Sequence, residues 1–171
     1  MTLDQTVVLV PALEMTRLVG RFRMSYDPSA RAGVPAHITL LYPFVDPSQL
    51  TDQLLTQLDE LLEPSDAFTY SVTEVREFEQ GVLYLAPEPA NRFMRLTTMI
   101  SDHFHLLPFG GAHPTVVPHL TVIQSAPELE RSRIGSILKS GLPLTARASE
   151  AWLMVGNNES RWKTVHVSRF R

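Results

Sequence analysis

One short pattern occurs twice in this chain and constrains its fold more than any other feature. PAHITLLYPF covers residues 35–44, and VPHLTVIQ covers residues 117–124. Each places a histidine two residues before a threonine, in an apolar run that a proline introduces. Such a run favours a β-strand. Two matching strands, with His37 and His119 lying 82 residues apart, indicate a duplicated fold.

The elements predicted around the two strands follow one order. Each strand is preceded by a helix and a loop, and is followed by a second helix and a hairpin. The first set comprises a helix over 13–24, a loop over 27–35, the strand over 36–44, a helix over 46–64 with Ser48 as N-cap, and a hairpin of strands 67–80 and 82–87. The second set comprises a helix over 87–107, a loop over 108–118, the strand over 119–125, a helix over 127–141, and a hairpin of strands 143–155 and 161–170. A buried strand over 5–13 precedes both sets.

This order predicts an α+β protein with two mostly antiparallel sheets and helices outside them. The length of 171 residues fits a single domain, 1–171, with approximate repeat halves 13–87 and 88–170. Apart from the two His-x-Thr strands the halves share few residues, so the repeat is one of element order. We therefore expect a bilobal, duplicated fold with approximate two-fold symmetry.

Composition excludes several classes of function. Cysteine is absent, which rules out disulfides, thiolate metal sites and a cysteine nucleophile. The formal charge of -3 argues against binding nucleic acid mainly through bulk electrostatics. The apolar run at 6–10 is too short to cross a membrane, and no basic residue precedes it as in a secretion signal. We expect a cytoplasmic, monomeric globular protein.

Side chains alternate between the two faces of a strand, and this places the polar residues of each motif together. His37 and Thr39 share one face, as do His119 and Thr121. The opposite faces are apolar and suit packing on helices. If a two-fold relates the lobes, two imidazoles and two hydroxyls meet in one central groove. By the same alternation Tyr42 falls on the apolar face and belongs to the core.

Two imidazoles in one groove are the groups that phosphodiester transfer needs without a metal. A neutral imidazole takes a proton from the attacking hydroxyl or water, and an imidazolium gives one to the departing oxygen. The ordinary histidine pKa of about 6.5 allows both forms near neutral pH. Threonine hydroxyls can donate to the non-bridging oxygens, where negative charge lies in the transition state.

PAHITL and PHLTVI resemble the paired H-x-T/S-x motifs of the two-histidine phosphoesterase superfamily, which includes the 2′-5′ RNA ligases and RNA cyclic phosphodiesterases. The order of elements is similar to that of its compact bacterial members over essentially the whole chain. The resemblance implies a central groove, His37 and His119 as the acid–base pair, and Thr39 and Thr121 as phosphate ligands. It also implies no metal or other cofactor, and a small nucleotide or RNA-end phosphodiester as substrate.

Two other functions stay open at this point. The same groove could serve a binding module for phosphates or nucleotides in which catalysis is weak or lost. A metal-dependent hydrolase using His37, His113 and His119 is the poorer alternative, because no acidic ligand accompanies either motif. The sequence does not fix the substrate, the direction of reaction, or which histidine is the base.

The remaining polar and aromatic residues have plainer interpretations. His103 and His105 diverge on a helix and suit the charge at its end. His113 is expected in a solvent-exposed loop, and His166 on the surface of the last strand. The arginine runs 21–23 and 131–133 are expected on solvated helix faces. Phe44, Tyr84, Trp152 and Trp162 are candidates for stacking a base, but the pattern does not place them.

Overall fold

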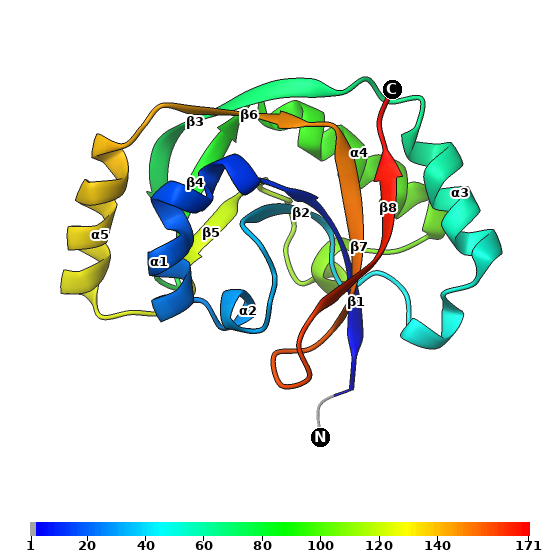
Figure 1. The fold of residues 1–171 in the computed structure, drawn as a ribbon, viewed down its shortest axis with the longest axis horizontal. Coiled ribbons are helices and arrows are strands. Elements are labelled where there is room, and N and C mark those ends of the chain that lie inside the picture. Colours follow the sequence, from blue (N-terminus) through cyan, green and yellow to red (C-terminus); the bar gives the residue numbers. More distant parts are fainter. Residues whose placement is uncertain (1–2) are drawn as a thin grey trace.

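The fold comprises two four-stranded sheets with helices packed around them, and a computed structural model describes it for residues 3–171 (Figure 1). The predicted domain also includes residues 1 and 2, which lie outside this range. The strands are β1 (Gln5–Pro11), β2 (His37–Leu41), β3 (Phe68–Glu77), β4 (Leu83–Glu88), β5 (Leu120–Ile123), β6 (Leu144–Ala148), β7 (Glu150–Gly156) and β8 (Lys163–Arg169). The α-helices are α1 (Thr16–Tyr26), α2 (Pro28–Arg31), α3 (Asp52–Leu62), α4 (Ala90–Phe104) and α5 (Glu128–Ser140). Short 3-10 helices are η1 (Leu13–Met15), η2 (Pro47–Gln49) and η3 (Pro108–Gly111).

The two sheets have corresponding strand orders. Sheet A runs β2-β1-β7-β8 and sheet B runs β5-β4-β3-β6, with every neighbouring pair antiparallel. Each sheet therefore has one motif strand, β2 or β5, at its edge. The predicted α+β class with two antiparallel sheets is confirmed.

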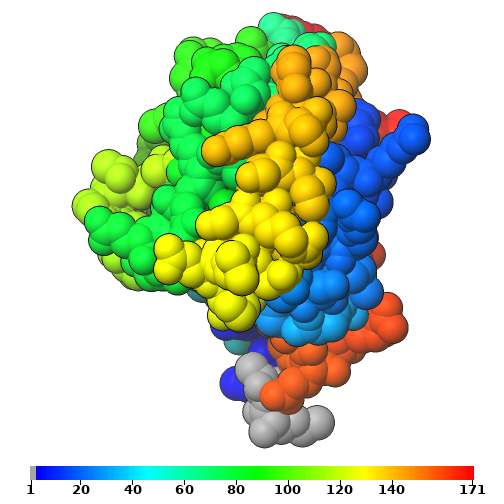
Figure 2. Space-filling view, turned by 90° about the vertical axis from the view of Figure 1, so that its left-hand side faces the viewer, coloured from blue at the N-terminus to red at the C-terminus, as the bar shows by residue number. Residues whose placement is uncertain are grey.

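The helices connect the two sheets. The helix before each motif strand packs on the opposite sheet, because α1 contacts β5 whereas α4 contacts β2. The helix after each motif strand instead packs on the sheet of its own motif, since α3 contacts β8 of sheet A and α5 contacts β3 of sheet B. Figure 2 shows α5 and α1 side by side on one face of the molecule. The sequence β1-α1-β2-α3 is thus repeated as β4-α4-β5-α5, as a duplicated fold requires.

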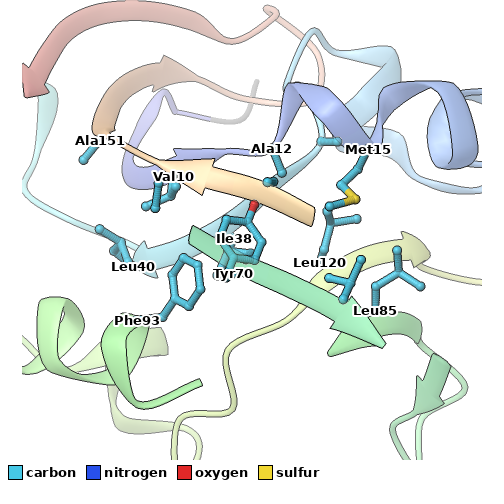
Figure 3. Close-up of a cluster of buried hydrophobic side chains, with 14 of the residues drawn as sticks. Val10, Ala12, Met15, Ile38, Leu40, Tyr70, Leu85, Phe93, Leu120 and Ala151 are labelled. Carbon is cyan, nitrogen blue, oxygen red and sulfur yellow. The ribbon is translucent and has the colours of Figure 1, made fainter. Parts of the chain in front are cut away.

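One continuous core joins the two sheets. Figure 3 shows Val10, Ile38 and Leu40 of sheet A in the same cluster as Tyr70 and Leu120 of sheet B. These side chains are at most 1% exposed. Burial of this kind, at roughly 25 cal/mol per Å² of apolar surface, holds the two motif strands in fixed positions.

Two local predictions were wrong. Segment 143–155 is two strands, because the chain leaves sheet B at Ala148 and enters sheet A at Glu150. Only its second part forms the predicted hairpin with β8. Ser48 lies in a 3-10 turn that Asp46 caps, so the N-cap of α3 is Thr51, whose hydroxyl accepts from the backbone N–H of Leu54. A proline at position 47 favours this separate first turn.

None of the helices in residues 3–171 is both long enough and apolar enough to traverse a lipid bilayer.

Candidate active site

The two motif strands lie next to each other where the edges of the sheets meet. Strands β2 and β5 are in contact, and a cavity of about 380 Å³ opens beside them. His37, Thr39, His119 and Thr121 all line this space, which we term the site cavity. The structure therefore brings together the four side chains that the two motifs single out. Within each motif strand the intervening residues are fully buried, in agreement with the predicted alternation.

A β-bulge follows the threonine of the first motif. Leu9 of β1 pairs with Thr39 and Val8 pairs with Leu41, so Leu40 is an extra residue between them. One extra residue reverses the facing of all side chains that follow. Tyr42 consequently lines the site cavity, and its prediction as a core residue was wrong.

The second motif has a bulge at the corresponding position. Tyr84 of β4 pairs with Thr121 and Leu83 pairs with Ile123, which leaves Val122 as the extra residue. Gln124 is turned to the site cavity as Tyr42 is, five residues after its histidine. The duplication thus extends to backbone irregularities that simple alternation does not show.

Both histidines are oriented by the same backbone contact. Nδ1 of His37 lies 2.8 Å from the carbonyl oxygen of Pro35, and Nδ1 of His119 lies 2.6 Å from that of Val117. Because a carbonyl oxygen only accepts, Nδ1 must donate its hydrogen in each case. The neutral ring then has an unprotonated Nε2, which is available to a ligand in the site cavity.

The surroundings favour the neutral form of both rings. Burial and, to a smaller extent, the positive charge of Arg23 lower the pKa of His37 to about 4. Burial also lowers the pKa of His119, and the nearby His113 adds to this effect. Loss of hydration penalises the imidazolium and the bond to each carbonyl opposes the shift, but burial is the larger effect at both sites.

A buried ion pair lies behind the first motif. Arg23 is 3% exposed and donates to Asp27 Oδ2 from Nε and Nη2, at 3.2 and 2.9 Å. Its Nη1 also donates to the carbonyl of Val34, while Asp27 Oδ1 accepts from the backbone N–H and hydroxyl of Ser29. The pair therefore fixes the 27–34 segment, four of whose residues line the site cavity. The predicted solvated face for 21–23 was wrong at Arg23.

Aromatic rings lie beside the histidine of the second motif, and none of the described residues forms a buried ion pair there. The rings of Phe78 and Tyr84 stack at 4.2 Å, and both make edge contacts with His119, at centroid distances of 5.1 and 5.6 Å. Tyr84 thus has a place beside the second histidine that the sequence pattern did not reveal. These rings cover one side of the imidazole and so contribute to the burial that lowers its pKa.

A second set of aromatic residues lines the site cavity on the side of the first motif. Trp162 and Phe109 each make an edge contact with Tyr42, at 6.5 and 6.4 Å between ring centroids. Phe109 has a φ of 54°, and its backbone N–H donates to the carbonyl of Tyr42 at 2.6 Å. Asn158 completes this wall and accepts from the indole N–H of Trp162 at 3.2 Å.

None of the other histidines that the structure describes lines the site cavity. His113 is exposed in its loop, as expected, and contacts the ring of Phe109. His166 was predicted on the surface, but it is half-buried against α3, where Asp59 lies 2.8 Å from its Nε2. His103 and His105 are exposed at the end of α4.

Phe44 and Trp152, the remaining stacking candidates, pack into the main core and into a smaller cluster on sheet A. Sequence reasoning did not identify several cavity residues. The spacing Arg23-x-x-x-Asp27 was visible as a helical ion-pair pattern. Trp162 was named but not placed, and nothing in the sequence singled out Gln124 or Asn158.

Over residues 3–171, no group of three or more histidine, aspartate or glutamate side chains is arranged to hold a metal ion. His113 does not join His37 and His119 in such a cluster.

A family model and two relatives match most of this chain. The model of the family described as the 2′-5′ RNA ligase superfamily matches residues 10–159. A Geobacillus kaustophilus protein, described as a candidate phosphoesterase, is 28% identical over 136 residues, which are 78% of this chain and 76% of the relative. A similarly described protein from Geobacillus sp. is 27% identical over 72% of this chain and 70% of its own length.

Solved structures have the same fold. Escherichia coli LigT in complex with 3′-AMP superposes with a TM-score of 0.64 at 15% identity, over 98% of both chains. TT0787 of Thermus thermophilus superposes with a TM-score of 0.62 at 15% identity, over 96% of this chain and 97% of its own.

Proposed function

The chain belongs to the 2′-5′ RNA ligase superfamily, and we propose that it is a metal-independent phosphodiesterase with His37 and His119 as general acid and base. Its substrates are cyclic or 2′-5′-linked phosphodiesters of nucleotides or RNA ends, and the same site can catalyse the reverse ligation. Thr39 and Thr121 bind the phosphate. The observation that carries the proposal is the convergence of both motifs on one cavity.

The chemistry follows from the orientation of the two rings. The neutral imidazole accepts a proton at Nε2 from the attacking water or hydroxyl, whose oxygen forms a bond to phosphorus. The other ring, protonated at Nε2, gives its proton to the oxygen whose bond to phosphorus breaks. Before the next turnover, the ring that accepted a proton releases it to solvent and the ring that gave one takes a proton up from solvent. The carbonyls of Pro35 and Val117 retain the Nδ1 hydrogens throughout, so each ring moves a proton only at Nε2.

The two threonines suit the phosphate between the rings. Each lies two residues after its histidine on the same strand face, so both hydroxyls open into the site cavity. Hydroxyls that donate to non-bridging oxygens stabilise the charge that these oxygens bear in the transition state. The family relationship and the names of the Geobacillus relatives support a phosphoesterase reaction of this kind.

An assay panel tests the proposal. The panel consists of nucleoside 2′,3′-cyclic phosphates, ADP-ribose cyclic phosphate, 2′-5′ oligoadenylate and RNA ends, each with and without EDTA. We expect turnover of at least one member, unchanged by EDTA. Turnover that EDTA abolishes would contradict the two-histidine mechanism.

A phosphate titration separates the enzyme from the binding module. Inorganic phosphate followed by NMR at about pH 6 should shift the signals of both motifs, because a bound anion favours protonation of the imidazoles. Binding without turnover of any panel member would favour the binding module instead. If phosphate did not bind and no panel member were turned over, the proposed site would be ruled out.

A further inference from the structure

The site cavity extends beyond the four motif residues, and this extension has its own chemistry. Its lining includes the aromatic residues Tyr42, Trp162 and Phe109, the buried apolar residues Val7 and Val34, and the exposed Asn158. At about 380 Å³ the whole cavity is near the small end of the range for ligand sites, which is roughly 300–1,000 Å³. It therefore fits one small planar group beside one phosphate.

The turn between β7 and β8, residues 157–162, presents two of these side chains and is firmly built. Asn157 is 5% exposed, and its Oδ1 accepts from the backbone N–H groups of Glu159 and Ser160, both at 2.7 Å. A side chain at Gly156 would collide with the carbonyl of Arg161, so the two ends of the turn approach as only glycine allows.

The same turn is tied to the wall of the site cavity. The backbone N–H of Trp162 donates to the carbonyl of Ala32 at 2.8 Å. In Figure 2 the turn, in orange-red, lies beside the blue segment that contains Ala32. Trp162 is thus held at the cavity before any ligand binds, which lowers the entropy that a ligand loses on stacking there.

We propose that Trp162 and Asn158 form a nucleobase subsite, which makes the turn at 157–162 the element that selects nucleotides over other phosphodiesters. The base stacks on the indole of Trp162, since every base has a π-face that an aromatic ring can cover. Asn158 accepts the indole N–H with Oδ1, so its amide NH₂ can donate to an acceptor on the edge of the base. This inference rests on the proposed function, because the phosphate of the same ligand lies between the two histidines.

The charged residues around the site cavity favour a ligand with a single phosphate. Of the described residues, no lysine or arginine lines the site cavity, and Asp27 brings a negative charge to its wall. Arg23 is already paired with that carboxylate. Additional phosphates would therefore lose their hydration without gaining a cation, so the subsite favours nucleoside monophosphates and their cyclic diesters over polyphosphates.

Tryptophan fluorescence tests the subsite without requiring turnover. The chain has two tryptophans, Trp152 and Trp162, and both pack against the smaller apolar cluster on sheet A. Of the two, only Trp162 lines the site cavity. Adenosine 3′-monophosphate should quench wild-type fluorescence saturably, since a base stacked on an indole quenches it. Trp152→Phe should retain this quenching, and Trp162→Phe should lose it. Inorganic phosphate should reverse the quenching by competition and cause none itself.

Two results would overturn the subsite. One is equal quenching in wild type and Trp162→Phe, and the other is the absence of saturable quenching in Trp152→Phe. ATP that binds more tightly than adenosine 3′-monophosphate would overturn the preference for a single phosphate.

Kinetics distinguish this inference from the proposed function. Trp162→Leu should lower kcat/KM for a nucleoside 2′,3′-cyclic phosphate by about 5–150-fold, the equivalent of one stacked base, chiefly through KM. For glycerol 1,2-cyclic phosphate, which has no base, the loss of kcat/KM should be much smaller. Equal effects on both substrates would overturn the subsite and leave the phosphodiesterase in place. Failure of the wild type on both substrates would contradict the phosphodiesterase, while the quenching experiment would still decide the subsite.

Discussion

His37 and His119 each donate Nδ1–H to the carbonyl two residues before them, at 2.8 and 2.6 Å, but the groups behind the two rings differ in kind. Behind His37 lies the buried pair of Arg23 and Asp27, with its charges close enough to act on the imidazole. Beside His119 lie the stacked rings of Phe78 and Tyr84. The backbone of the two motifs is therefore repeated, whereas their electrostatic surroundings are not.

This difference shows which part of the site depends on the duplicated backbone. Strand parity, the bulge after the threonine and the carbonyl contact recur in both motifs, and these fix where Nε2 and the hydroxyl lie. The pKa of each ring is set by the particular side chains around it. The pair can thus have symmetric geometry and unequal proton affinity, which suits one ring that accepts a proton while the other gives one.

The largest loss of activity should follow the removal of either imidazole. His37→Ala and His119→Ala should each lower kcat/KM by about 10²–10⁴-fold, because each removes a positioned proton-transfer group. The double variant should lose far less than the product of the two losses, since the pair acts as a unit. Steady-state kinetics on the best substrate of the panel measures all three variants.

Circular dichroism provides the control for these variants, which should fold because both rings line the site cavity and are not part of the hydrophobic core. Full activity in either single variant would refute the two-histidine mechanism.

The charge pair behind the first motif should matter most for stability. Arg23→Ala leaves Asp27 buried without its cation, which commonly costs about 3–5 kcal/mol of unfolding free energy. Urea unfolding measures this. Arg21→Ala, on the same helix, is the matched control: its side chain is exposed over Phe22, so we expect a loss below about 1 kcal/mol.

Arg23→Ala should also change the pKa of one of the two histidines and not that of the other. Arg23 lowers the pKa of His37, so its removal should raise that pKa and leave the pKa of His119 unchanged. Equal stability of the two arginine variants would show that the ion pair is unimportant.

Acid should destabilise the fold through His37. Its folded pKa of about 4 lies below the ordinary 6.5, so the unfolded chain binds more protons between these values. The contribution of His37 to the free energy of unfolding is therefore present above about pH 6.5 and is lost as the pH falls toward 4. Between pH 7 and pH 5 the loss should be about 2 kcal/mol for this one group.

Urea unfolding at the two pH values, in wild type and in His37→Gln, isolates the contribution of His37. The variant should lack this part of the pH dependence. If the free energy of unfolding depended on pH equally in wild type and in His37→Gln, other groups would be responsible for that dependence.

Sequence patterns predicted the elements and the meeting of the two motifs because these follow from strand parity and helix periodicity, which are local. They failed at Tyr42 because the bulge at Leu40 depends on pairing with β1, about 30 residues earlier. They failed at Arg23 because its burial depends on the 27–34 segment folding over α1. Turn residues marked the 156–160 segment, but its position beside Ala32 depends on the tertiary fold.

The smallest effect should come from the aromatic residues beside the second motif, and it would sharpen the comparison most. Phe78→Ala removes one of the two rings that shield His119 from water, so the pKa of His119 should rise toward its ordinary value. The pKa of His37 should move far less, because its shift comes chiefly from its own burial and from Arg23, and His119 is the smallest of its causes. Histidine ring signals followed by NMR across the acid range measure both values in one sample. Tyr84→Phe keeps the second ring and should leave the pKa of His119 where it is. If Phe78→Ala shifted both histidines alike, the two surroundings would not be independent, and the electrostatic difference between the motifs would need another cause.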